Sequence, residues 1–128
     1  MNTTIFNLMK TSDKIEDISS SISVNNVNGS GRTKDTLAYC KLYKFGKLVF
    51  GGLRIVAGTE LKKSEYIAKG FPIPDSNRAN YVTAVLKCAG VSFCAWVEYG
   101  TGYLKTGSGN STLAASSGCI MSVLYICE

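Results

Sequence analysis

Hydrophobic and polar residues alternate with a period of two along most of the chain after residue 35. In residues 36–44, one face of the expected strand carries Ala38, Cys40 and Leu42. Alternation of this kind predicts half-buried β-strands. Comparable segments occupy residues 48–56, 81–89, 91–99 and 103–106, and the apolar residues 119–127 predict a final strand that is buried on both sides. About seven short strands with turn residues between them predict an all-β fold over residues 36–128, an antiparallel β-sandwich of jelly-roll-like form.

The N-terminal part of the chain follows a different spacing. Five of its residues are spaced as the a and d positions of a heptad repeat: Leu8, Thr11, Ile15, Ile18 and Ile22. Such a stripe predicts a short α-helical coiled coil, and isoleucine at both positions favours three chains over two. We therefore expect a helical stalk over residues 11–24 that forms a homotrimer, with these five residues at the trimer interface.

The segments on either side of the stalk have a different composition. Residues 25–35 are rich in Asn, Gly and Ser, which predicts a linker. Residues 1–10 either continue the helix or form a separate anchoring segment.

The composition fits one domain with a small appendage. Hydrophobic residues make up 45% of the 128 positions, which is sufficient for a core, and charged residues only 18%. A charged fraction this low is typical of a chain that hides part of its surface in an oligomer. The longest apolar runs are too short to cross a membrane. The first twenty residues lack the apolar region of a signal peptide, so we expect synthesis in a cytoplasm.

The formal net charge of +5 is concentrated in the domain. No acidic residue interrupts a series of basic ones, namely Lys41, Lys44, Lys47 and Arg54. This series would suit an anionic partner, but lysines on a strand also prevent edge-to-edge aggregation, and we favour that interpretation. The aromatic residues form no RNA-binding signature, so no nucleic-acid partner is expected.

The sequence argues against most catalytic chemistry. It contains no histidine, which excludes Ser-His-Asp and Cys-His catalysis and metal sites built on histidine. Five cysteines without a C-x-x-C spacing are expected to be buried thiols rather than a zinc site. Glycoside hydrolysis would need two of the acids Glu60, Glu65, Asp75 and Glu98. Nothing in their spacing indicates a pair, so we expect a non-enzyme without metal or cofactor.

The best candidates for ligand binding lie around one expected hairpin. Gly100-Thr101-Gly102 predicts a tight turn, and aromatic and polar side chains near it could form a recognition rim: Trp96, Tyr99, Tyr103, Lys105 and Asn110. For Trp96 we favour a structural role, in the core or at an interface between subunits, over stacking on a sugar ring.

Three segments resemble the C-terminal head domains of bacteriophage tail-fibre and baseplate receptor-binding proteins. They are residues 42–49 (LYKFGKLV), residues 67–74 (IAKGFPIP) and residues 122–126 (SVLYI). In that family, a short stalk leads into a β-sandwich head, and three chains assemble side by side. The resemblance implies a virion fibre whose head contacts the host surface and whose residues 1–10 bind another virion protein.

These observations lead to one functional hypothesis with two alternatives. The favoured one is a non-enzymatic phage virion protein whose trimeric head binds a host-surface glycan or cell-wall polymer. The first alternative is a purely structural decoration or assembly protein of a virion. The second is a glycan-cleaving tail enzyme.

Overall fold

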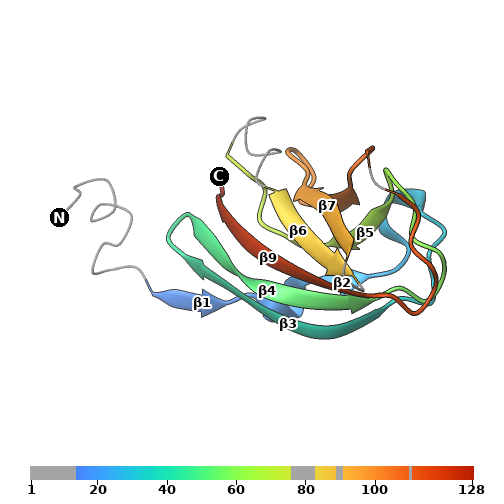
Figure 1. Ribbon diagram of the computed structural model, residues 1–128. Coiled ribbons are helices and arrows are strands. Elements are labelled where there is room, and N and C mark those ends of the chain that lie inside the picture. The colour runs from blue at the N-terminus through green and yellow to red at the C-terminus, as the bar shows by residue number, and fades with distance from the viewer. Residues whose placement is uncertain (1–13, 76–82, 89–90, 110) are drawn as a thin grey trace.

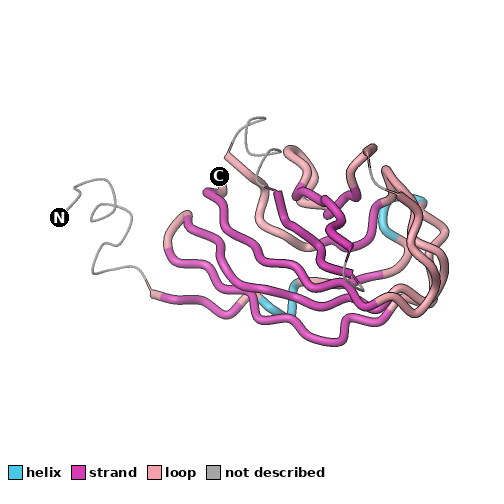
Figure 2. Tube along the Cα trace, viewed as in Figure 1, coloured by secondary structure: helices cyan, strands magenta, loops and turns pink. Residues whose placement is uncertain are grey.

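The computed structural model describes residues 14–75, 83–88, 91–109 and 111–128, and these residues form an all-β domain (Figure 1). Its strands are β1 (Ile15–Asp17), β2 (Ser23–Val24), β3 (Thr36–Phe45), β4 (Leu48–Val56), β5 (Tyr66–Lys69), β6 (Thr83–Cys88), β7 (Val91–Val97), β8 (Leu104–Thr106) and β9 (Gly118–Ile126). Figure 2 shows that helix is limited to short turns, the 3-10 helices η1 (Ser19–Ser21) and η2 (Val27–Gly29). The predicted all-β class is confirmed.

All the strand pairs are antiparallel, in the order β1-β3-β4-β9-β6-β7-β8-β5-β2. The central pairs are long: β4 pairs with β9 from Leu48–Ile126 to Val56–Gly118. β3 and β4 form a hairpin with a two-residue turn, in which Gly46 has a φ of 57°. A positive φ suits glycine and matches the twist of a tight hairpin. The expected strands at 36–44, 48–56 and 119–127 are confirmed.

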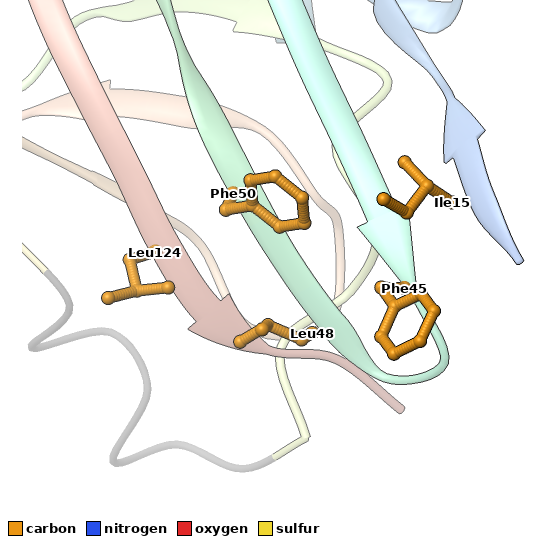
Figure 3. Close-up of a pocket in the computed structure, with 5 residues that line it drawn as sticks. All are labelled: Ile15, Phe45, Leu48, Phe50 and Leu124. Atoms are coloured by element: carbon orange, nitrogen blue, oxygen red, sulfur yellow. The ribbon is translucent and has the colours of Figure 1, made fainter. Parts of the chain in front are cut away.

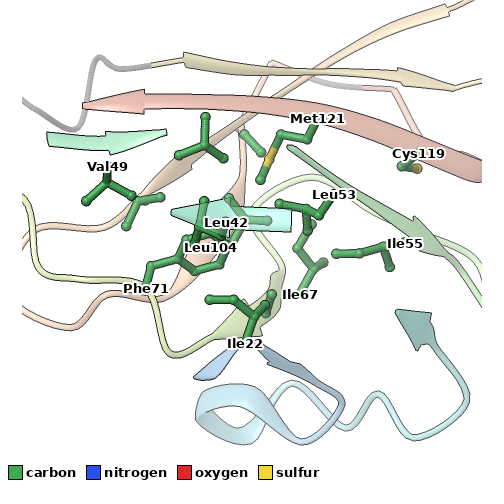
Figure 4. Packing of buried hydrophobic residues seen from close by; sticks show 14 of the residues in the cluster. Ile22, Leu42, Val49, Leu53, Ile55, Ile67, Phe71, Leu104, Cys119 and Met121 are labelled. Carbon is green, nitrogen blue, oxygen red and sulfur yellow. The ribbon is translucent and has the colours of Figure 1, made fainter. Parts of the chain in front are cut away.

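The alternation in these strands separates an inner face from an outer face. Along β9, every second residue is buried, beginning with Cys119 and Met121, whereas Ile120 and Leu124 are exposed, so the expected burial of this strand on both sides is wrong. The inward side chains of different strands meet in a single hydrophobic cluster (Figure 4), which contains Ile22, Leu42, Leu53, Ile67, Phe71, Leu104 and Met121. The sheet therefore curls around one core.

One short segment closes the sheet. Residues 15–17 pair with β3, and residues 23–24, just beyond η1, pair with β5 at the other end of the strand order. Between them, the amide of Ile18 donates a hydrogen bond to the Leu42 carbonyl (2.9 Å). The Ser21 hydroxyl donates one to the Gly70 carbonyl (3.0 Å). Both ends of the sheet are thus joined by residues 15–24.

The helical stalk predicted over residues 11–24 is therefore wrong in its described part. The structure has two strands and a 3-10 turn there. Serine side chains that bond to backbone groups compete with helix formation, and Ser19 Oγ accepts a hydrogen bond from the Leu42 amide (2.9 Å). Of the expected interface residues, Ile22 is buried in the chain's own core, Ile18 packs against that core, and Ile15 is exposed. Leu8, Thr11 and the expected anchor at residues 1–10 lie outside the described residues.

The segment expected to be a linker, residues 25–35, is instead packed into the domain. Val27 is fully buried, and Arg32 is only 4% exposed. The Arg32 guanidinium donates to both carboxylate oxygens of Asp35, at 2.6 and 2.7 Å, and to the carbonyls of Thr59 and Glu60. A bidentate pair of this kind combines charge with fixed geometry. The bonds from Arg32 to the two carbonyls, and the bond from the Gly58 amide to Asp35 (2.9 Å), fasten residues 25–35 to the connection between β4 and β5.

The closure of the sheet depends on a close approach at Gly70. This residue has a φ of 96°, and a Cβ added there would overlap the carbonyl oxygen of Ser21. We expect Gly70→Ala to lower the free energy of unfolding by about 3 kcal/mol, through backbone strain and this overlap. Gly100→Ala is the matched control, since Gly100 has a φ of 90° with nothing near its Cβ position. It should cost about 1 kcal/mol. Urea denaturation measures both, and equal losses would contradict the packing at Gly70.

The Arg32–Asp35 pair should be important for stability. Asp35→Ala leaves the buried guanidinium without its main counter-charge, and also removes the acceptor of the Gly58 amide (2.9 Å). Breaking a buried pair on one side costs about 3 kcal/mol or more. We expect a loss of that size in urea denaturation, whereas Glu16→Ala, at an exposed position, should leave the midpoint unchanged. If Asp35→Ala left the urea midpoint unchanged, the Arg32–Asp35 pair would contribute little to the stability of the fold.

Candidate functional site

Three aromatic or basic side chains form a row across the outer face of β7, β8 and β5. Trp96 of β7 lies opposite Lys105 of β8, and Lys105 lies opposite Tyr66 of β5. Trp96 and Lys105 are half-buried, and the neighbours of each along its strand are buried. The strand alternation therefore directs this row away from the core.

The turn between β7 and β8 adds a carboxylate and a second tyrosine. The Glu98 amide donates to the Tyr103 carbonyl (2.7 Å), and the Gly102 amide donates to the Glu98 carbonyl (3.0 Å). Gly102 has a φ of 71°, and a Cβ there would overlap the carbonyl oxygen of Phe71. Glycine is required at this position, and the turn holds Glu98 and Tyr103 next to β5.

We call the resulting group of Tyr66, Glu98, Thr101, Tyr103 and Lys105 the Tyr66 cluster. The hydroxyl of Tyr66 donates to Glu98 Oε2 (2.8 Å), and that of Thr101 donates to Glu98 Oε1 (2.9 Å). The Tyr103 ring meets the Tyr66 ring edge to face, with centroids 5.6 Å apart. Lys105 Nζ lies 5.1 Å from the centroid of the Tyr66 ring, a cation–π distance.

These contacts alter the acidity of Tyr66. The hydrogen bond to Glu98 raises the pKa of the Tyr66 hydroxyl, and partial burial and the negative charge of Glu98 act in the same direction. The hydroxyl is therefore a stable hydrogen-bond donor at neutral pH. Its bond to Glu98 fixes the orientation of the ring.

The Tyr66 cluster combines the groups that a sugar ligand requires. Its aromatic rings can pack against the apolar side of a sugar ring. Its carboxylate oxygens can accept hydrogen bonds from sugar hydroxyls, and its ammonium group can donate them. The polar side chains of the cluster belong to strands or to the tight turn. Less conformational freedom is therefore lost when a ligand binds.

The structure brings together only some of the predicted residues. Tyr103 and Lys105 belong to the Tyr66 cluster, and Trp96 lies next to Lys105 in the same row. Tyr99 is 37% exposed in the adjacent turn. Asn110 lies outside the described residues.

Sequence reasoning did not identify Tyr66 and Glu98 as binding residues. Tyr66 falls in a segment without clear alternation, and its pairing with β8 includes a register irregularity. Glu98 is the only acid between Asp75 and Glu128 and is followed by an aromatic residue. Its position as an isolated acid beside an aromatic residue was the one feature of the sequence that could have identified Glu98 as a binding residue.

The cysteines and acids do not gather into a metal site in the described part of the chain. Among these residues, no group of three metal-ligating side chains comes together. Cys119 is disulfide-bonded, so its expected role as a buried thiol is wrong. Cys127 is a buried free thiol, as expected, whereas Cys40 is half-buried and Cys94 is exposed, contrary to the expectation. Within the same described residues, no helix is long and apolar enough to span a membrane.

Comparison of the chain with known protein families, curated proteins and solved structures found no match.

The link between Tyr66 and Glu98 can be tested by spectrophotometric titration of tyrosine. The difference between the wild type and Tyr66→Phe isolates the titration of Tyr66, whose midpoint should lie above that of an unperturbed tyrosine. Glu98→Gln should lower this midpoint, because it removes the negative charge and the strong acceptor. Thr101→Val keeps the carboxylate and should leave the midpoint raised. A midpoint that Glu98→Gln does not change would contradict the assigned hydrogen bond.

Proposed function

We propose that the protein is a non-enzymatic carbohydrate-binding protein that recognises a glycan through the Tyr66 cluster. The observation that carries this proposal is the Tyr66–Glu98 hydrogen bond within a group of aromatic rings and one cation. Aromatic surface and polar groups in fixed positions are the usual components of a ligand site.

The arrangement favours binding over turnover. Glu98 is bonded to two hydroxyl groups of its own chain, and Glu65 bonds to Arg32 and to the amide of Lys62. Each carboxylate has its own structural partners, whereas glycoside hydrolysis needs two carboxyl groups on either side of one bond. We therefore place the protein among binding proteins rather than glycosidases.

The proposal extends to a biological setting through the resemblance to phage head domains. The segments that carry this resemblance coincide with the β3–β4 hairpin, the region of β5 and the chain after it, and β9. On this basis we propose a virion protein, attached to other virion proteins through residues 1–10, whose homotrimeric heads bind a host-surface glycan or cell-wall polymer. The net charge of +5 would favour an anionic polymer.

A second candidate function, a purely structural role in a virion, is favoured by a different observation. The outer face of β1, β3, β4 and β9 contains an exposed apolar groove, lined by Ile15, Phe45, Leu48, Phe50 and Leu124 (Figure 3). We call these five residues the apolar groove. Exposed apolar patches commonly mark contacts between proteins. A decoration or assembly protein would use this groove and would not need the Tyr66 cluster.

Binding of the labelled protein to intact host cells and to their isolated glycans separates these functions. We expect binding that is lost when the glycans are stripped from the cells. Tyr66→Ala should weaken it at least tenfold, because it removes the ring and the partner of Glu98. The control is Tyr39→Ala, a tyrosine that is 55% exposed on β3, which should bind like the wild type. Absence of glycan binding, or equal effects of the two substitutions, would leave the structural role as the better explanation.

A further inference from the structure

Two hydrogen-bond donors in the row of Trp96, Lys105 and Tyr66 are open to a ligand. They are the ammonium group of Lys105 and the indole N–H of Trp96, whose residues pair directly across β8 and β7. Within the part of the chain that the structure describes, neither group has a hydrogen-bond or ion-pair partner. Among the same residues, no fully buried polar side-chain atom lacks a partner. The Trp96 N–H is therefore accessible from solvent.

The charge of Lys105 is held in place without being neutralised. The side chain is half-buried, and its Nζ lies 5.1 Å from the centroid of the Tyr66 ring. An aromatic face attracts a cation but carries no counter-charge. A partly buried charge without a counter-charge is unfavourable, so an anion that arrives with a ligand would stabilise it.

The carboxylate of the Tyr66 cluster does not supply this counter-charge. Glu98 accepts hydrogen bonds from the hydroxyls of Tyr66 (2.8 Å) and Thr101 (2.9 Å). In the described structure it forms no ion pair with Lys105. The binding surface thus has a donor half at Trp96 and Lys105 and an acceptor half at Glu98.

The two halves are far enough apart to contact different parts of one oligosaccharide. β8 lies between β7 and β5, so the row crosses two interstrand spacings, about 10 Å in all. A chain of sugars laid across these strands would reach the donors on β7 and β8 and the acceptor in the β7–β8 turn.

We propose that this surface recognises an acidic glycan, whose anionic group binds between Lys105 and Trp96. The ammonium and the indole N–H can donate to two oxygens of one carboxylate or phosphate group, and a charged acceptor strengthens both bonds. Hydroxyl groups of the adjoining sugar would donate to Glu98. Lys105 and Trp96 then determine specificity, because a neutral sugar leaves the cation without a counter-charge.

This assignment rests on the glycan binding proposed above and names the class of glycan. The net charge of +5 would attract any anionic polymer. Such attraction depends on all exposed lysines alike and weakens with salt, whereas binding in the row depends on Lys105. Substitution of lysines at different places on the surface therefore separates the two effects.

Chemical neutralisation of the glycan isolated from host cells tests the charge requirement. Reduction of its carboxyl groups to alcohols removes carboxylates, and dephosphorylation removes phosphates. Binding is measured by isothermal titration calorimetry at physiological ionic strength, where general attraction is largely screened. We expect one of the two treatments to weaken binding at least about tenfold, and that treatment identifies the anionic group. Binding that neither treatment weakens would overturn the recognition of an acidic glycan.

Two substitutions in the row assign the effect to its residues. Lys105→Met keeps the apolar stem and removes the charge. It should weaken binding of the untreated glycan at least about tenfold and leave binding of the neutralised glycan unchanged. Trp96→Phe keeps an aromatic ring and removes the N–H, and should weaken the untreated glycan alone, to a smaller extent. Equal losses for both forms of the glycan would show that Lys105 acts only through the structure of the site, and would overturn the assignment.

The matched control is Lys47→Met. Lys47 is exposed in the β3–β4 turn, and its substitution removes the same charge from a different part of the surface. This variant should bind the untreated glycan like the wild type, and urea denaturation should show the same midpoint for all three variants. Equal effects of Lys47→Met and Lys105→Met would mean attraction by net charge and would overturn the proposal.

Failure of this inference and failure of the proposed function give different results. A wild type that does not bind the untreated glycan removes both. Binding that depends on Tyr66 but not on Lys105 overturns only the assignment of the anionic group. A loss with Lys105→Met that is confined to the untreated glycan supports both.

Discussion

The closure of the sheet by residues 15–24 is the constraint on which the rest of the structure depends. This segment hydrogen-bonds to β3 through Ile18 and to the end of β5 through Ser21. A sheet with two open edges would expose unpaired backbone groups and invite aggregation. Here β1 and β2, on either side of the turn η1, supply partners for part of β3 and part of β5, and the same segment places Ile22 in the core. The requirement for glycine at residue 70 follows from this close approach.

The same closure determines where the Tyr66 cluster and the apolar groove lie. β2 pairs with β5, and this pairing holds the strand that carries Tyr66 beside β8. β1 pairs with β3, and this pairing holds Ile15 at the edge of the apolar groove. One segment of ten residues thus supports a polar, aromatic surface through its second half and an apolar surface through its first half. The two surfaces use different strands of the same sheet.

The sequence predicted the parts of the fold whose signals are local. Period-two alternation and a glycine turn are properties of neighbouring residues, so the β3–β4 hairpin was predicted correctly. β9 was predicted as a strand from its apolar run, but it is buried on one face and not on both. Residues 15–24 were not, because the spacing of Ile15, Ile18 and Ile22 fits both a heptad helix and a strand–turn–strand segment. The deciding contacts, from the serines to Leu42 and Gly70, are distant in sequence. Tyr66 was missed for the same reason, since strand register joins it to Lys105 across 39 positions of the chain.

Arg32 shows how a buried charge converts a segment with the composition of a linker into part of a domain. Residues 25–35 contain few apolar side chains, and Val27 is the one fully buried hydrophobic residue among them. Hydrophobic burial alone would order such a segment weakly. The Arg32 guanidinium instead binds a carboxylate within the segment and two carbonyls of the β4–β5 connection. Because these acceptors surround one rigid, planar group, they can be satisfied together only when both segments are in place. Polar contacts therefore position the connection that leads into β5, and with it the strand that presents Tyr66.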